Sequence, residues 1–181
     1  MIENKISILG IPGNLREKSS HKSILLQIAA MAPAGVELII YNGLSSLPHF
    51  NPDIDTENAP ASVVDLRNQL KHADAVIICT PEYAFGVPGS LKNAMDWTVS
   101  SGELVNKPLA LITASSTGEK AHAALQNIFT ALSVNITTER NLLIPFIRAK
   151  VDEKGNLKNT DDIHAVEILL HSLIKDVSVP E

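Results

Sequence analysis

Short apolar runs alternate with amphipathic segments along most of the chain. Four apolar and largely β-branched runs, each followed by turn residues, cover residues 6–9, 36–40, 75–78 and 109–112. Runs this short and apolar predict strands of a parallel sheet that helices cover on both faces. A weaker run at residues 142–146 predicts a fifth strand.

Between and after these runs, apolar residues recur at helical spacing, which predicts helices that each bury one face. The predicted faces are Ile24, Leu25 and Ile28; Val63, Leu66 and Leu70; Ala121, Leu125, Ile128, Phe129 and Leu132; and Ile163, Val166, Leu169, Leu170, Leu173 and Ile174. This alternation predicts right-handed βαβ crossovers and an open, doubly wound α/β sheet. In such sheets ligands bind outside the carboxyl ends of the strands, so the loops after strands one, three and four are the candidate site. Polar segments at residues 51–60 and 152–160 are predicted surface loops.

Composition and charge narrow the class of protein. A chain of 181 residues fits one domain, and a net charge of −5 without a basic stripe argues against nucleic-acid binding. The single cysteine, Cys79, cannot form an internal disulfide, which fits a reducing compartment. We find neither a signal peptide nor an apolar stretch of the roughly 20 residues that a membrane helix needs. We therefore expect a cytoplasmic protein.

The loop after the first strand, residues 10–22, combines glycines, an arginine and a helix start. Glycine allows tight backbone turns, and a helix start offers free N–H groups with a partial positive charge. Ser19 or Ser20 can cap the helix, and Arg16 adds a planar donor suited to phosphate oxygens. These features predict an anion site. The alternative is an ordinary turn with a capped helix and an exposed arginine.

The spacing within this loop restricts the anion. The loop lacks the Gly-Lys-Ser/Thr of nucleoside triphosphate-binding loops. A dinucleotide fingerprint needs G-x-G-x-x-G and an acid after the second strand, but that strand ends in Tyr-Asn-Gly at residues 41–43. The pattern therefore favours a monophosphate, such as that of FMN, over a tightly held NAD.

The loop after the third strand begins with Pro81, which fixes φ and ends the strand. Phe85 and Gly86 let the backbone bend close to a flat ligand, and Pro88-Gly89 predicts the start of a helix. The alternative is a proline-rich loop whose aromatic residues pack against their own helix.

The amino-acid sequence of this loop and of the helix after it resembles that of the NADPH-dependent FMN reductase family. This family includes quinone, azo-dye and chromate reductases. That family carries a Pro-Glu-Tyr-Asn turn and then a Pro-Gly-x-Leu-Lys-Asn-Ala-x-Asp-Trp helix. This chain has Pro-Glu-Tyr at residues 81–83 and the whole helix motif at residues 88–97. The family's Gly-Ser-Leu-Arg-x-x-Ser loop is matched by Gly-Asn-Leu-Arg-Glu-Lys-Ser at residues 13–19. The resemblance runs from about residue 5 to residue 135.

The resemblance implies a single flavodoxin-like, FMN-binding domain over residues 1–181, with a five-stranded sheet in the order 2-1-3-4-5. It also implies that the first loop holds the FMN phosphate and that the second cradles the isoalloxazine ring, largely through backbone atoms. The implied phosphate contacts are Asn14, Arg16, Ser19 and His21, and the implied ring contacts are Pro81, Glu82, Tyr83 and Ala84. Three of these depart from the family's usual residues, because Asn14 replaces a serine and both His21 and Ala84 replace asparagines.

The loop after the fourth strand reads Ala-Ser-Ser-Thr-Gly-Glu-Lys at residues 114–120. Small residues and a glycine let N–H groups face a ligand's carbonyl edge, and donors beside a flavin stabilise the charge of the reduced ring. The resemblance likewise implies flavin contacts from this loop, at Ser115, Ser116, Thr117 and Gly118. The alternative is a plain helix start with a serine or threonine as the N-cap and Glu119 in the first turn.

We expect an FMN-dependent NAD(P)H oxidoreductase that passes electrons through the flavin to a quinone-like or other small acceptor. No side chain is needed as an acid or base, so no catalytic residue is predicted, and the scattered histidines predict no metal site. The resemblance implies a homodimer or homotetramer, and the helix that carries Leu91, Met95 and Trp97 is a candidate subunit contact. No feature of the sequence distinguishes NADPH from NADH.

Two alternatives to this expected function remain. One is a non-enzymatic, flavodoxin-type electron carrier. The other is a member of the fold that binds a partner but no flavin.

Overall fold

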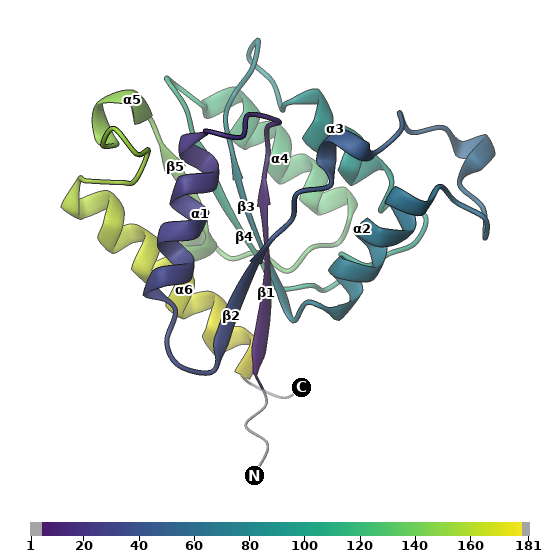
Figure 1. Cartoon of the computed structure of the whole chain (residues 1–181), viewed down its shortest axis with the longest axis horizontal. Helices are drawn as coiled ribbons and strands as arrows, with labels where there is room; N and C mark the ends of the chain where they lie inside the picture. Colours follow the sequence, from purple (N-terminus) through teal and green to yellow (C-terminus); the bar gives the residue numbers. More distant parts are fainter. Residues whose placement is uncertain (1–4, 179–181) are drawn as a thin grey trace.

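The structure, a computed structural model, describes residues 5–178 and is built around one parallel sheet (Figure 1). The strands are β1 (Ile6–Pro12), β2 (Val36–Ile40), β3 (Ala75–Thr80), β4 (Leu109–Ala114) and β5 (Asn141–Ile144). They lie in the order β2-β1-β3-β4-β5, and every pair is parallel. This confirms the predicted flavodoxin-like α/β fold and its strand order.

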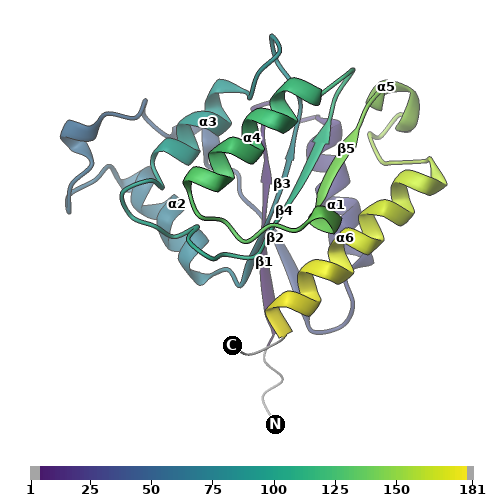
Figure 2. The same cartoon turned by 180° about the vertical axis from the view of Figure 1, so that it is seen from behind.

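Helices cover both faces of the sheet. They are α1 (Ser20–Met31), α2 (Ala61–His72), α3 (Gly89–Asp96), α4 (Glu119–Ala131), the short α5 (Ile147–Lys150) and α6 (Thr160–Ser178), with 3-10 turns η1 (Leu44–Ser46), η2 (Pro52–Ile54) and η3 (Thr138–Arg140). Figures 1 and 2 show α1 and α6 on one face and α2, α3 and α4 on the other. No helix in the described part of the chain is long and apolar enough to cross a membrane.

Two apolar cores lie between the sheet and these helices, because successive strand residues point to opposite faces. Ile77 packs with α1 and α6, whereas its neighbour Ile78 packs with α2, α3 and α4. Every residue of β3 and β4 is buried. This burial on both faces explains why these strands are continuous apolar runs in the sequence.

Strand β1 is longer than the sequence predicted. Its pairing with β3 continues through Pro12, and Gly10, which we had assigned to the following loop, lies inside the strand. A Cβ atom at residue 10 would lie 2.8 Å from the Leu38 Cδ2 atom, so the glycine allows β2 to pack closely there. The candidate anion-binding loop therefore begins at Gly13.

The apolar side chains of helix α3 are buried in the core of the protein. Leu91, Met95 and Trp97 are at most 1% exposed, and the Trp97 indole donates a hydrogen bond of 2.9 Å to the Pro48 carbonyl. These three side chains therefore belong to the core of their own subunit, and a subunit contact through the exposed face of this helix stays a prediction.

Candidate functional site

The loops that follow β1, β3 and β4 meet at the carboxyl edge of the sheet, as expected for parallel strands. They line a cavity of about 300 Å³. Nine of the predicted site residues line it: Asn14, Arg16, Ser19, His21, Pro81, Glu82, Tyr83, Ser115 and Ser116. Three predicted residues, Ala84, Thr117 and Gly118, are not part of its lining. Within residues 5–178, no cluster of three or more metal-ligating side chains occurs.

The first loop presents a helix start and an arginine to this cavity. Ser19 is the N-cap of α1, and its Oγ atom accepts a hydrogen bond of 3.2 Å from the Lys22 N–H. Arg16 is exposed, and no carboxylate of residues 5–178 lies within 4 Å of its guanidinium. The loop lies tightly against the end of β3, because a Cβ atom at Gly13 would overlap the Thr80 side chain. A capped helix start beside an unpaired arginine is an anion-binding arrangement.

His21 ties this loop to the end of β4. Its ring accepts a hydrogen bond from the Asn14 amide at Nδ1 (2.8 Å) and donates from Nε2 to the Ala114 carbonyl (2.7 Å). The Asn14 side-chain oxygen in turn accepts the Arg16 N–H at 2.9 Å. The Ala114 carbonyl can only accept and the Asn14 amide nitrogen can only donate, so this arrangement requires the neutral ring with its proton on Nε2.

The surroundings of His21 favour the same neutral state. Burial lowers the pKa of His21, and the nearby Arg16 charge lowers it further, against the opposing effect of the Ala114 hydrogen bond. Both ring nitrogens are engaged within the protein, so His21 positions Asn14 and the loop backbone. Direct contact of its ring with a phosphate stays a prediction.

Glu82 has a role that the sequence did not reveal. Its carboxylate accepts hydrogen bonds from the N–H groups of Lys120 and Ala121, both at 2.9 Å, and from the Thr117 hydroxyl at 2.9 Å. The helix N-cap is Gly118, and it provides no side-chain cap. Our alternative of a serine or threonine N-cap was therefore wrong, because a residue from the β3 loop satisfies the free N–H groups of α4.

These bonds also set the ionisation of Glu82. Burial raises the pKa of the Glu82 carboxyl, but the hydrogen bonds from Ala121, Thr117, Gly118 and Lys120 outweigh it and leave the pKa below its usual value. The charged carboxylate therefore connects the β3 loop to the β4 loop and the start of α4. The Glu82 backbone N–H adds a second connection between these loops, because it donates to the Ser115 hydroxyl at 3.2 Å.

The next four residues form a two-residue hairpin turn. The backbone groups of Tyr83 and Gly86 exchange two hydrogen bonds, of 3.0 and 2.9 Å. Ala84 and Phe85 at the tip both have positive φ angles, 49° and 58°. Two successive residues of this kind define the type I′ turn, which favours Asn-Gly. Phe85 is 78% exposed, so packing of its ring does not stabilise the positive φ angle. Phenylalanine also adopts such an angle rarely.

The β4 loop is joined to the segment after β5. The Ser115 and Ser116 carbonyls accept hydrogen bonds from the Ile147 and Phe146 N–H groups, at 3.0 and 3.1 Å. This brings Ile147 and Arg148 into the cavity lining, together with Ser20 of α1. Ile147 and Arg148 are not among the predicted site residues, because the prediction covers only the loops after strands one, three and four. The same carboxyl-edge rule, applied to the fifth strand, would have found them.

Comparison with known proteins assigns the chain to a family. The sequence model of the NADPH-dependent FMN reductases matches residues 6–147, which include all three loops. The chain belongs to the NADPH-dependent FMN reductase family. The predicted resemblance is thereby confirmed, and with it the oxidoreductase class and the cofactors, FMN with NAD(P)H as co-substrate.

Two bacterial relatives match this chain over most of their length. The chain is 30% identical over 157 residues to a quinone reductase of Escherichia coli K12, which covers 83% of this chain and 84% of the relative. It is 29% identical over 161 residues to an NAD(P)H-dependent FMN reductase of Pseudomonas aeruginosa, covering 86% of each chain. The fold is similar to that of an NAD(P)H:(acceptor) oxidoreductase of Paracoccus denitrificans, with a TM-score of 0.81 and 24% identity over 95% of this chain and 97% of that one.

The residues present fit the family's cofactor. The start of α1, with Arg16 and the Ser19 hydroxyl, supplies donors and positive charge for a phosphate. A cavity of about 300 Å³ lies at the lower end of the range for ligand pockets. Ser115, which is buried, and Ser116 add two small hydroxyl side chains from the β4 loop to the lining.

Proposed function

We propose that the protein takes electrons from a reduced nicotinamide and delivers them to a quinone or another small electron acceptor. The observation that carries this proposal is the convergence of three loops on one cavity, with Arg16, which has no carboxylate partner within residues 5–178, in the loop before α1. Bound FMN supplies the hydride chemistry, and the protein binds and orients it.

The residues around the cavity divide this task. We propose that Arg16, Ser19 and the α1 N–H groups hold the FMN phosphate, and that Asn14 shapes the loop through its bonds to His21 and Arg16. The backbone of residues 81–84 would lie along the ring, and residues 116 and 117 would supply N–H donors to its polar edge, because the Ser115 and Gly118 N–H groups already donate to the Ile144 carbonyl and to Glu82.

Small acceptors suit the exposure of this site. Tyr83 is 49% exposed and Phe85 78% exposed, so the turn beside the cavity presents aromatic surface to solvent. A planar quinone can stack on such surface. The name of the Escherichia coli relative, a quinone reductase, supports this acceptor class. We further propose that the protein is cytoplasmic and forms a homodimer or homotetramer. Light scattering of the purified protein would test the oligomeric state.

Spectroscopy and kinetics test the proposed function together. The purified protein should bind FMN with a shifted flavin absorbance spectrum, and either NADPH or NADH should bleach that spectrum without oxygen. Steady consumption of nicotinamide with a benzoquinone should then follow. Turnover that requires a separate reductase would instead identify an electron carrier. A protein that takes up no FMN would overturn both readings.

A further inference from the structure

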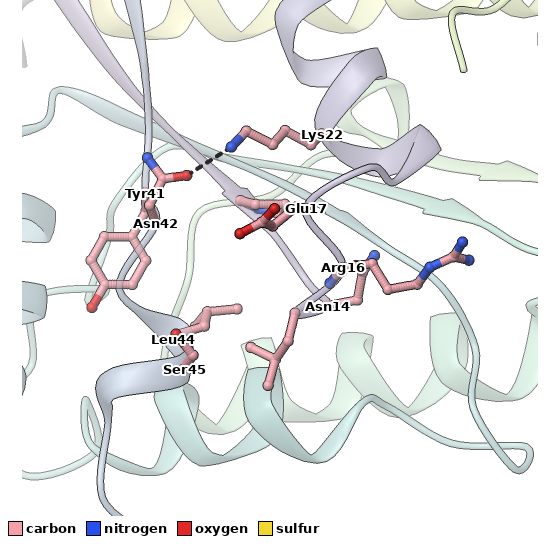
Figure 3. Close-up of a pocket in the computed structure, with 10 residues that line it drawn as sticks. Asn14, Arg16, Glu17, Lys22, Tyr41, Asn42, Leu44 and Ser45 are labelled. Carbon is pink, nitrogen blue, oxygen red and sulfur yellow. Dashed lines mark hydrogen bonds between the residues drawn. The ribbon is translucent and has the colours of Figure 1, made fainter. Parts of the chain in front are cut away.

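A second cavity, of about 340 Å³, adjoins the flavin pocket at the first loop (Figure 3). The two cavities share Asn14 and Arg16, but the second extends toward the end of β2 and η1, which line no part of the first. Figure 3 shows the Arg16 side chain directed away from Lys22 and Asn42. The second cavity therefore has its own polar groups, next to the proposed phosphate loop.

Lys22 is one of two cations that line this second cavity, and the other, Arg16, also lines the first cavity. Lys22 lies in the first turn of α1, and its Nζ atom donates a hydrogen bond of 3.1 Å to the side-chain oxygen of Asn42. The Asn42 amide nitrogen donates in turn to the Ile40 carbonyl at 3.1 Å. Among residues 5–178 no carboxylate lies within 4 Å of Lys22 Nζ. A neutral partner thus holds the ammonium group at the carboxyl end of β2, where its charge is available to a ligand.

Apolar groups line the same cavity. Leu15, which is 55% exposed, stands beside it, and Leu44 and the Tyr41 ring contribute from the β2 side. The Ser45 hydroxyl and the Asn42 amide add hydrogen-bonding groups. Apolar walls with a few convergent polar groups and two cations, Lys22 and Arg16, suit a flat base joined to a phosphorylated sugar.

We propose that this cavity receives the adenosine 2′-phosphate end of NADPH, with Lys22 as the phosphate-binding residue. This inference rests on the proposed function, in which a reduced nicotinamide reaches the flavin in the neighbouring pocket. In dinucleotide-binding α/β folds, an acid after the second strand binds the ribose 2′-hydroxyl of NADH, and a basic group accommodates the 2′-phosphate of NADPH. Here residues 41–43 hold no acid, and an ammonium group stands at that position.

Glu17 is the one carboxylate that lines this cavity within residues 5–178. It is exposed, and it forms no ion pair with Lys22. Its negative charge repels a phosphate bound in the same cavity and so lowers the affinity of the cavity for that phosphate. Removing that charge should strengthen binding of the 2′-phosphate, which gives a second variant with the opposite expected sign.

Calorimetry of the FMN-loaded protein with two fragments tests the assignment. The fragments are 2′,5′-ADP, which carries the 2′-phosphate, and 5′-AMP, which lacks it. Lys22→Gln should weaken 2′,5′-ADP binding roughly 10- to 100-fold, the loss of one charged hydrogen bond, and leave 5′-AMP within about twofold. Glu17→Gln should tighten 2′,5′-ADP. The control is Lys18→Gln, which makes the same change in net charge on an exposed side chain that does not line the cavity.

Equal weakening of both fragments by Lys22→Gln, or an equal effect of Lys18→Gln, would overturn the 2′-phosphate assignment. Anaerobic reduction of the flavin by each nicotinamide separates this failure from that of the proposed function. Reduction by NADPH and NADH at rates that Lys22→Gln leaves equally unchanged overturns only the assignment. A flavin that neither nicotinamide reduces overturns the proposed function and this inference with it.

Discussion

Two loops of the candidate site are anchored to neighbouring segments by opposite chemistry, one to the end of β4 and the other to the start of α4. The loop after β1 is held by the neutral ring of His21, which is 7% exposed and bonded to the Ala114 carbonyl. The loop after β3 is held by the charged carboxylate of Glu82 on the free N–H groups of α4. In each case one side chain makes the connection: His21 from the start of α1, which follows the first loop, and Glu82 from within the second loop. The difference lies in protonation, because the first anchor works uncharged and the second works charged.

The two loops also differ in backbone strain. The first loop has no residue with a positive φ angle between Gly13 and Ser19, whereas the tip of the second has two in succession, Ala84 and Phe85. Each such non-glycine residue costs on the order of 1 kcal/mol or more. Such strain persists only where the surrounding contacts hold it, and at this turn the Glu82 anchor lies immediately before it.

Removing the charged anchor should have the largest effect on stability. In Glu82→Ala, the first N–H groups of α4 lose their acceptor, so the free energy of unfolding should fall by about 1–2 kcal/mol. Urea unfolding of the flavin-free protein measures this without any contribution from FMN binding.

The matched control for this substitution is Glu119→Ala. Glu119 is an exposed carboxylate in the first turn of the same helix, and its side chain accepts no hydrogen bond within residues 5–178. It should cost only a few tenths of a kcal/mol, through the helix dipole. Equal losses in the two variants would show that Glu82 acts by charge alone and does not cap the helix.

Relieving the strained turn should have a smaller effect of the opposite sign. Phe85→Gly places glycine at the second position of a type I′ turn, and because the ring is 78% exposed, little packing is lost. We expect the free energy of unfolding to rise by about 1 kcal/mol and the melting temperature to rise by about 2–4 °C.

The control for the turn is Phe85→Leu, which keeps a side chain at the same positive φ angle and should give no gain. A Phe85→Gly variant less stable than wild type would mean that the ring makes stabilising contacts in solution, for example with a second subunit.

The fold was predictable from the sequence because its signals are local and repeated. Apolar runs buried on both faces marked β3 and β4, and Ser19 was one of the two caps proposed for α1. Which loops form the cavity followed from the sheet topology. The errors came where contacts join distant segments.

Both loop anchors are contacts of this kind. Glu82 caps a helix that begins 37 residues later, as the residue numbers show, and His21 bonds a carbonyl 93 residues away. Neither contact has a sequence pattern, because either side chain could equally have pointed into the cavity. The strain at Ala84 was also hidden, although a motif that usually has asparagine there is consistent with a positive φ angle.

The smallest expected effect is a pH dependence that separates the two anchors. Burial holds the folded-state pKa of His21 below its ordinary value of 6.5. Between these two values the unfolded chain binds more protons than the folded one, so the His21 contribution to stability falls as the pH falls. Protonation of Nδ1 would break its bond from the Asn14 amide and place a second positive charge near Arg16. The pKa of Glu82 is likewise lowered, but from 4.5, so its contribution is lost only in more acidic solution.

Comparison of wild type with His21→Asn isolates the neutral anchor. Urea unfolding of both proteins between about pH 7.5 and 5.5 should show the stability advantage of wild type shrinking as the pH falls. His122, whose pKa is also lowered by burial, is present in both proteins and cancels in the difference. Glu82→Ala measured over the same range should differ from wild type by a constant amount, since that carboxylate stays charged throughout. A wild-type advantage over His21→Asn that grew in acid would mean that the ring binds in its charged form, and that both loops are anchored by charged side chains.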